Sequence, residues 1–296
     1  MGSYPPVLPP HEQGPVRGSY VPQSEILPPD TGYAPPPVRQ RRPGWASAPA
    51  TYFLVGINCL VFVAMALHGA GIWLPSTDQL LQFGADRAPN VLILGEWWRI
   101  LTAMFVHVGI LHLATNMWCL WNLALLAEPL MGSAGVFAVY ILTGAAGNLL
   151  STFYSWTWPV RDSSGLPFFP AGAGASGAVF GIAGALIVLL KSNRLPVPAE
   201  ELKGLRRSVI YFAGINLVIG FSINFGSGLT GVLVDNSAHV GGFLCGLLFA
   251  LPMVPRIGSP RTTFERRLRL AVLMTVLLLV LFGFYVAHVL PPQGLS

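Results

Sequence analysis

Charged side chains are scarce in this sequence: Asp, Glu, Lys and Arg make up 10% of its 296 residues, where soluble globular proteins carry roughly 25%. Hydrophobic residues account for 53%. A chain with so little charge and so much apolar side-chain surface cannot be solvated throughout as a soluble domain is. This composition indicates a membrane protein.

Several motifs are also missing, and each absence disfavours a class of chemistry. The three cysteines, Cys59, Cys119 and Cys245, fall in separate apolar stretches, which is typical of small core residues and not of a disulfide framework or zinc site. The sequence has no His-Glu-x-x-His motif, no phosphate-binding glycine loop and no aspartate within an apolar segment. We therefore predict no metal and no nucleotide cofactor, and we exclude an aspartyl dyad.

Residues 1–49 contain 13 of the 26 prolines and no apolar run. Such a segment buries too little surface to offset the entropy of ordering, so we predict a disordered, Pro-rich cytoplasmic tail without a cleavable signal peptide. Its proline pairs are compatible with polyproline ligands, although a solvated tether is the simpler interpretation.

Apolar segments close to the ~20 residues needed to cross a bilayer follow the tail. They cover about 51–72, 104–127, 132–154, 174–191, 208–225, 236–255 and 270–290. The sequence thus predicts an all-α polytopic membrane protein with a six-helix core at 50–255. A basic linker and a seventh transmembrane helix follow at 256–296.

The distribution of positive charge predicts the orientation of these segments. Fourteen of the 17 Lys and Arg residues precede the first segment or follow the fourth and sixth, and only Arg87, Arg99 and Arg161 lie on the other side. Basic loops stay cytoplasmic, so we expect a multi-pass plasma-membrane protein with its N-terminus inside and its C-terminus outside. The net charge of +5 then reflects topology and not a nucleic-acid partner. The abundance of Ala, Gly, Pro and Arg indicates a GC-rich bacterial genome.

Two reactive side chains share one depth in this topology. Ser176 lies near the start of the fourth segment and His239 near the start of the sixth, and both segments enter the bilayer from outside. At 1.5 Å per residue each lies about one turn below the same surface. Polar groups inside a membrane usually serve a function, so we predict a nucleophile and a base at Ser176 and His239.

Small residues next to this pair would allow the two helices to approach closely. Gly177 and Gly181 are four apart in one segment, and Gly242 and Gly246 are four apart in the other. Paired small residues permit tight helix packing in lipid. Generic transmembrane packing explains one such pair equally well, whereas two beside Ser176 and His239 favour a site.

A serine nucleophile also requires donors for the oxyanion that develops in the transition state. His112 and Asn116 are four apart and share one face of the second segment. A lone histidine here is more often a satisfied core residue, but Asn116 on the same face favours an oxyanion site at His112 and Asn116, to which the Ser176 N–H would add a donor. Asp235 is the only carboxylate near His239. Since helix capping is its simpler role, we favour a dyad over a triad, and we expect Glu128 to be a structural anchor.

At this level of detail the sequence resembles the rhomboid family of intramembrane serine proteases, over about residues 51–255. The resemblance rests on five motifs, each in the expected segment and order: Trp98-Arg99, His112-x-x-x-Asn116, Glu128-x-x-x-Gly132, Gly174-Ala175-Ser176-Gly177 and Ala238-His239-x-x-Gly242-x-x-x-Gly246. One departure is Phe180, where family members often carry tyrosine.

The resemblance implies a function and a partner. It implies a six-helix core in which Ser176 is the nucleophile, His239 the base, His112 and Asn116 the oxyanion donors, and Trp98-Arg99 a brace for the outer loop. The expected reaction is cleavage of transmembrane helices of other proteins within the lipid bilayer, without metal or ATP. A catalytically silent binding or quality-control protein on the same scaffold is the alternative, and an unrelated channel is a weaker one.

Access for substrate and water is expected at the fifth segment, 208–225. This segment is short, contains no buried charge and has Gly220, Gly226 and Gly228 at its end. We predict that it is a lateral gate, with the loop 226–235 as a flexible cap. An ordinary glycine-rich connector is the alternative interpretation. The loop 156–173 is unusually apolar, and we expect it to lie beside Ser176 at the membrane.

Overall fold

A computed structural model describes residues 48–161, 164–191, 198–225, 234–256 and 259–288, with side chains except at 220–225, 255 and 256. The Pro-rich tail up to residue 47 and most of the predicted cap, 226–233, lie outside these ranges. The predicted domain boundaries remain predictions.

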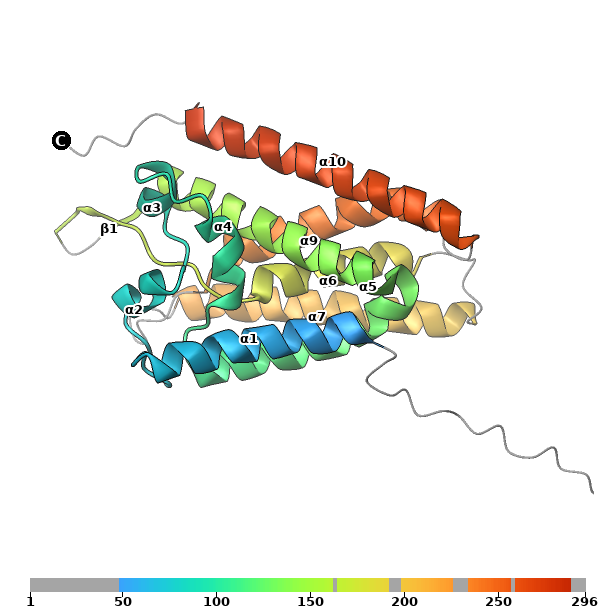
Figure 1. Cartoon of the computed structure of the whole chain (residues 1–296), viewed down its shortest axis with the longest axis horizontal. Coiled ribbons are helices and arrows are strands. Elements are labelled where there is room, and N and C mark those ends of the chain that lie inside the picture. Colours follow the sequence, from blue (N-terminus) through green and yellow to red (C-terminus); the bar gives the residue numbers. More distant parts are fainter. Residues whose placement is uncertain (1–47, 162–163, 192–197, 226–233, 257–258, 289–296) are drawn as a thin grey trace, which may run out of the picture. The chain divides into compact units, whose positions relative to one another are not determined.

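Helices make up most of the described chain (Figure 1). In chain order the elements are α1 (Pro49–Leu67), α2 (Thr77–Gln82), α3 (Ala88–Leu92), α4 (Arg99–Thr102), η2 (Ala103–Phe105), α5 (Ile110–Thr157), β1 (Val160–Arg161), β2 (Pro167–Phe168), α6 (Ser176–Leu189), α7 (Ala199–Phe225), α9 (Asn236–Ala250), η3 (Leu251–Arg256) and α10 (Arg261–His288). The two strands form one antiparallel hairpin in which Val160 pairs with Phe168.

Four helices of the described residues are long and apolar enough to cross a bilayer: α1, α5, α9 with its extension to Val254, and α10. The 48-residue α5 is two helices joined at Gly132, whose φ of 68° and ψ of 167° interrupt the helical backbone. We call 110–131 the first arm and 133–157 the second arm. With the 14-residue α6 and with α7, these helices follow the order of the seven predicted segments. The all-α polytopic membrane fold, with a six-helix core and a seventh helix, is confirmed.

Three helices begin at residues other than those predicted, two of them earlier and one later. The α7 and α10 helices begin nine residues before their predicted apolar segments, at Ala199 and Arg261, because charged residues extend a helix beyond the lipid without breaking it. The second segment begins six residues late, at Ile110. The residues before it form η2 and a turn at Gly109, whose φ is 88°.

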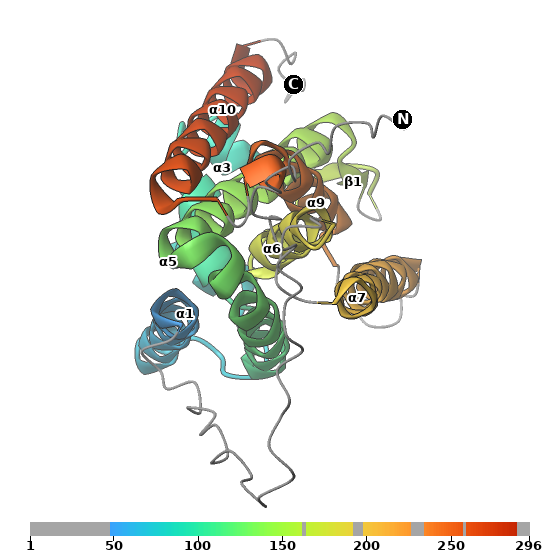
Figure 2. The same cartoon turned by 90° about the vertical axis from the view of Figure 1, so that its right-hand side faces the viewer.

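The α6 helix lies at the centre of the bundle, with α5, α9 and α7 around it (Figure 2). Every residue from Gly177 to Leu186 is buried, the pattern of a helix surrounded by protein on all sides. A Cβ added at Gly242 would overlap the carbonyl oxygen of Gly177, and one at Gly246 would overlap that of Gly181. The predicted glycine pairs therefore form the α6–α9 contact, with backbone against backbone.

The predicted anchor Glu128 fastens α1 to the kink of α5. Its carboxylate accepts hydrogen bonds from the backbone N–H groups of Ala50 and Thr51, at 2.9 Å each, and from the hydroxyls of Thr51 and Ser133, at 2.6 Å each. The first N–H groups of a helix have no partner within the helix. Glu128 satisfies two of them for α1, so its role is structural, as expected.

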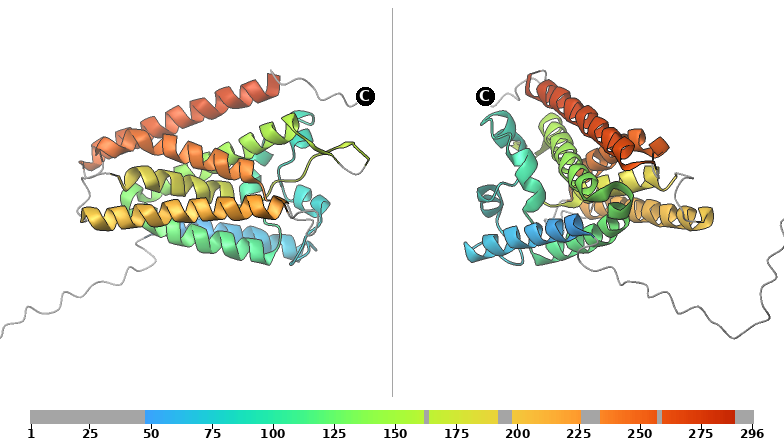
Figure 3. Two further views of the ribbon diagram at one scale, coloured as in Figure 1. Left: turned by 180° about the vertical axis from the view of Figure 1, so that it is seen from behind. Right: turned by 45° about the vertical axis from the view of Figure 1, so that its right-hand side comes forward.

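The loop between α1 and α5 contains α2, α3 and α4, which the sequence did not predict. These short helices lie at the same end of the bundle as the β1–β2 hairpin (Figures 1 and 3). Arg99 is 7% exposed, and it donates to the carbonyls of Leu81 and Ala85 and to Glu96 while its guanidinium lies 4.5 Å from the Trp98 ring. These contacts connect distant turns of the loop, the arrangement expected of a brace.

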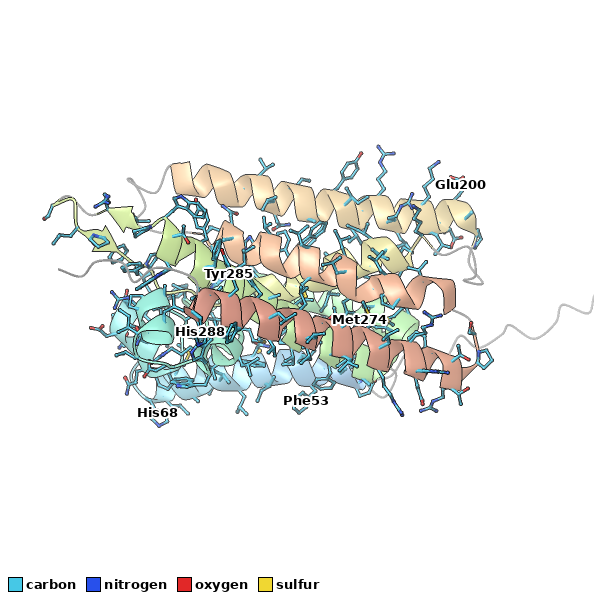
Figure 4. All side chains as sticks on the ribbon, turned by 90° about the horizontal axis from the view of Figure 1, so that it is seen from above. Phe53, His68, Glu200, Met274, Tyr285 and His288 are labelled. Carbon is cyan, nitrogen blue, oxygen red and sulfur yellow. The ribbon has the colours of Figure 1, made fainter. Side chains whose placement is uncertain are left out.

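Three labelled residues place the ends of three helices at the two ends of the bundle. His68 at the end of α1 and His288 at the end of α10 lie at one end, and Glu200 at the start of α7 lies at the opposite end (Figure 4). This matches the alternation that the predicted topology requires. Which end faces the cytoplasm remains a prediction.

Candidate active site

Ser176 is the first residue of α6. The first N–H groups of a helix lack intrahelical acceptors and carry the positive end of the helix dipole. At 1.5 Å per residue, the 14 residues of α6 span about 21 Å, which is less than the ~30 Å of hydrocarbon. The short helix thus leaves space for the preceding loop to descend to the serine.

Ser176 and His239 meet across the α6–α9 contact. The serine Oγ lies 2.9 Å from Nε2 of His239, within the reach of a hydrogen bond, so the hydroxyl donates to the ring when Nε2 is unprotonated. His239 is 7% exposed. Its Nδ1 has no hydrogen-bond partner among the described residues. The structure therefore brings together the two residues that the sequence placed at one depth.

The ring of Phe180 lies flat against the imidazole of His239. The ring centroids are 4.4 Å apart and the planes are tilted by 11°. Phe180 is one turn after Ser176, so α6 supplies both the hydroxyl and the surface that fixes the imidazole plane. The ring contact that the sequence led us to expect is present.

His112 and Asn116 lie on the first arm of α5 and line the same cavity as Ser176 and His239, with a volume of about 340 Å³. His112 Nδ1 accepts a hydrogen bond from the Val108 N–H at 3.3 Å. The proton of this ring is therefore on Nε2, where it can be donated. Asn116 Nδ2 donates to the His112 carbonyl at 3.0 Å, which leaves its second N–H available.

The loop before Ser176 is held in place by the outer loop between α1 and α5. Gly172 and Asp86 exchange backbone hydrogen bonds of 2.7 and 2.8 Å, and the Gly174 N–H donates to the Ala103 carbonyl at 3.0 Å. Irregular backbone at membrane depth requires such partners, because lipid offers none. A Cβ at Gly174, where φ is 128°, would lie 2.6 Å from Cε1 of His112. Glycine is required there for the loop to pass the histidine.

Sequence reasoning missed two buried residues that fix this loop. His107 is fully buried, and its Nε2 accepts from the Ala175 N–H at 3.4 Å while Nδ1 donates to the Phe105 carbonyl at 3.2 Å. Asp86 accepts from the Thr152 hydroxyl at 2.9 Å. Burial raises the pKa of the Asp86 carboxyl to about 7. The five-residue spacing of His107 and His112 could have indicated that both histidines belong to the site. Asp86 has no comparable residue near it in the sequence, so no local pattern indicated its role.

Asp235 caps α9, as expected. Its carboxylate accepts from the Ala238 N–H at 3.0 Å and from the hydroxyls of Ser237 and Ser151 at 2.6 and 2.5 Å. No hydrogen bond joins it to the imidazole of His239 in the part of the chain that the structure describes. No group of three or more His, Cys, Asp or Glu side chains that could hold a metal ion occurs among the described residues either.

These observations define a polytopic α-helical membrane protein whose packed helices bring a serine and a histidine together in a cavity. The chain belongs to the rhomboid family: the family profile described as "Rhomboid domain" matches residues 94–256.

Relatives from several organisms agree with this assignment. The chain is 33% identical over 239 residues to "Rhomboid protease GluP" of Bacillus subtilis (strain 168). The aligned region covers 80% of this chain and 40% of that protein. It is 29% identical over 187 residues to "Rhomboid protease AarA" of Providencia stuartii, covering 60% and 63%. It is 32% identical over 186 residues to "RHOMBOID-like protein 6, mitochondrial" of Arabidopsis thaliana, covering 62% and 53%. The chain thus matches about two fifths to two thirds of each relative's length.

Proposed function

We propose that this protein is an intramembrane serine protease that hydrolyses peptide bonds in transmembrane segments of other membrane proteins. The observation that carries the proposal is the 2.9 Å contact between Ser176 Oγ and His239 Nε2, in a cavity lined by α5, α6, α7 and α9. Two of the relatives are named rhomboid proteases, which supports the same reaction.

In the proposed mechanism His239 acts as the general base. It takes the hydroxyl proton as Ser176 Oγ bonds to the carbonyl carbon of the scissile peptide, and the carbonyl oxygen becomes an oxyanion. His239 then gives the proton to the leaving amine as the C–N bond breaks. A water molecule, deprotonated by His239, attacks the acyl-enzyme, releases the acid and regenerates the serine.

Three donors are proposed to stabilise the oxyanion: Nε2–H of His112, the second N–H of Asn116 and the backbone N–H of Ser176. The fixed tautomer of His112 supports its part. Donors held in place before the reaction stabilise developing charge without reorganising. Asp235 is proposed to take no direct part, because its three hydrogen bonds are to Ser151, Ser237 and Ala238.

The proposed substrate reaches this site from the lipid. Phe212, Asn216 and Ile219 of α7 form one wall of the cavity, so a displaced α7 would open it to a helix in the bilayer. We propose that the protein lies in a bacterial plasma membrane with its N-terminus inside, its C-terminus outside and its site toward the outer face. This orientation rests on the distribution of Lys and Arg.

The test is covalent labelling of the detergent-solubilised full chain with a fluorophosphonate, combined with cleavage of a transmembrane reporter substrate. We expect labelling at Ser176, and loss of both labelling and cleavage in Ser176→Ala, by about 10⁴-fold or more for cleavage. The control is Ser208→Ala, which removes an exposed hydroxyl on α7 and should change neither. EDTA should have no effect.

The same experiment tests the base. His239→Ala should be as inactive as Ser176→Ala, and the double variant should be no worse, because members of one catalytic unit are not additive. A folded wild-type chain that neither labels nor cleaves would favour the silent binding or quality-control protein. Cleavage inhibited by EDTA and restored by zinc would mean that the chemistry is different.

A further inference from the structure

An asparagine on α7 belongs to the cavity around Ser176 and has no role in the mechanism proposed above. Asn216 lines this cavity together with Ser176 and His239. A polar side chain within a membrane-spanning segment is unfavourable unless it has a partner, and such residues usually serve a function. The position of Asn216 and the atoms that it leaves free indicate what that function is.

Asn216 is on the side of α7 that faces the cavity. Phe212, Asn216 and Ile219, which are four and three residues apart, form one stripe on the helix, and all three line the cavity. Ile215 and Val218 do not line it, and they are 58% and 64% exposed. Asn216 itself is half-buried. Its amide therefore faces the same space as the Ser176 hydroxyl.

The hydrogen bond that Asn216 makes fixes the orientation of its amide. Nδ2 donates to the Phe212 carbonyl at 2.8 Å, and a carbonyl can only accept, so the amide oxygen is directed away from that carbonyl. Oδ1 accepts no hydrogen bond from the residues that the structure describes. It is also not one of the buried polar atoms that lack a partner, so it is accessible. Asn216 thus offers the cavity an acceptor with both lone pairs free.

Hydrolysis of a transmembrane helix would create a need for such an acceptor. In an intact helix each N–H is bonded to a carbonyl four residues earlier, and the side chains surround the backbone. Attack by Ser176 on a backbone carbonyl therefore requires a turn of the substrate to open, which frees both carbonyls and N–H groups. Lipid offers these groups no partner. The proposed oxyanion site supplies donors for a carbonyl, whereas a freed N–H requires an acceptor.

We propose that Asn216 is a substrate-binding residue whose Oδ1 accepts a backbone N–H from the unwound segment beside the bond that Ser176 attacks. The inference rests on the proposed protease function and adds a substrate contact on α7. A substrate that is still helical has no free N–H at this point, so Asn216 binds the unwound form and not the helical one. Since α7 is also the wall that the entering segment displaces, the contact forms where the substrate enters.

The first test is Asn216→Leu, which has a similar size and cannot form hydrogen bonds. We expect kcat/KM for a transmembrane reporter to fall about threefold to tenfold, the factor that one neutral hydrogen bond supplies. Fluorophosphonate labelling, which needs Ser176 and His239 but no substrate backbone, should persist. The matched control is Asn122→Leu, because Asn122 makes the same bond to the carbonyl four residues earlier on α5 and is outside the cavity. It should cleave at the wild-type rate.

The second test identifies the N–H that Asn216 binds. Synthetic transmembrane reporters carry an ester in place of one peptide bond, at each position within one helical turn of the cut bond, which itself stays an amide. An ester has no N–H. At one position it should cost the wild type the same threefold to tenfold, and it should cost Asn216→Leu nothing further. The ester weakens the substrate helix equally for both enzymes, so this double-mutant cycle isolates the contact.

Ester effects that are equal in the wild type and in Asn216→Leu at every position would overturn the proposal, as would wild-type cleavage by Asn216→Leu. If the leucine variant does not fold, Asn216→Ala replaces it in the same cycle. A folded wild type that neither labels nor cleaves would refute the protease function itself. An active wild type whose ester effects do not depend on residue 216 would refute only the role of Asn216.

Discussion

The contact of α6 with α9 and the contact of α6 with α7 differ in kind, although all three helices border the Ser–His cavity. Between α6 and α9, glycines bring backbone against backbone at Gly177–Gly242 and Gly181–Gly246. Between α6 and α7 the contact depends on larger side chains, with the rings of Phe180 and Phe212 6.3 Å apart. A Cβ added at Gly214 of α7 would meet nothing within 4 Å.

This difference indicates that one bundle can combine a rigid contact, between α6 and α9, with a more easily displaced one, between α6 and α7. Ser176 and His239 are on the glycine-packed pair, where a small displacement is resisted by backbone contacts. The α7 helix contributes lining residues to the cavity but no member of the Ser–His pair. If the protein is a protease, the chemistry requires the first contact and substrate access requires the second.

Adding one methyl group at Gly242, in the α6–α9 contact, and one at exposed Gly214 of α7, outside any contact, tests the tight packing most sharply. Gly242→Ala places a Cβ against the Gly177 carbonyl, so we expect overpacking of about 1–3 kcal/mol and loss of most cleavage activity. Gly214→Ala should leave activity unchanged and stabilise the helix slightly, since alanine is the better helix former. Thermal unfolding in detergent and reporter cleavage measure both. Equal effects of the two substitutions would contradict the distinction.

The proposed oxyanion donors, His112 and Asn116, are on α5, and their proposed role can be separated from packing. Asn116→Ala should lower kcat by roughly tenfold to a thousandfold with little change in KM, since the amide matters only in the transition state. The matched control is Asn122→Ala, because exposed Asn122 makes the same hydrogen bond to the carbonyl four residues earlier. If Asn116→Ala loses thermal stability in proportion to activity, Asn116 is a packing residue.

Restraining α7 should slow access without altering the chemistry. We would join Thr115→Cys on α5 to Ile219→Cys on α7 with a reducible cross-linker, in a variant without native cysteines; both positions line the cavity. Cleavage of a transmembrane substrate should fall several-fold and recover on reduction, while fluorophosphonate labelling of Ser176 should persist. Phe212→Ala should instead speed cleavage several-fold. Cleavage at the same rate with and without the crosslink would show that α7 is not the gate.

The smallest expected effect on activity comes from the outer loop, where the expected change is in stability. The pKa of Asp86 is raised from 3.8 to about 7 by burial, so the folded state binds a proton more tightly than the unfolded state. The contribution of this group to stability is full below about pH 3.8 and is lost as the pH rises through 7. The free energy of unfolding should fall by up to about 1.4 kcal/mol per pH unit in between.

Asp86→Asn, which imitates the protonated carboxyl, should remove this pH dependence. Unfolding in detergent at pH 5 and pH 8 measures it, with Asp78→Asn as the control. A wild-type protein that is equally stable at both pH values would show that the pKa of the Asp86 carboxyl is not raised in the folded state.

The sequence by itself determined most of the architecture, because the restrictions that lipid imposes can be read locally. Apolar length predicted the order of the segments. The spacing of glycines near Ser176 and His239 predicted the tight contact, and Asp235 before α9 predicted a cap, since each depends on neighbours within one or two turns.

The tertiary structure decided what depends on residues far apart in the chain. Ala50 and Thr51, which donate to Glu128, are on α1, and Asp86 pairs with Gly172. No local pattern encodes these contacts. The partnership of His107 with Ala175 spans 68 residues. Burial and hydrogen bonding depend on which loops descend between the helices, and only the packed bundle fixes this. The structure therefore supplied the loop that leads to Ser176 and the contacts that hold it in place.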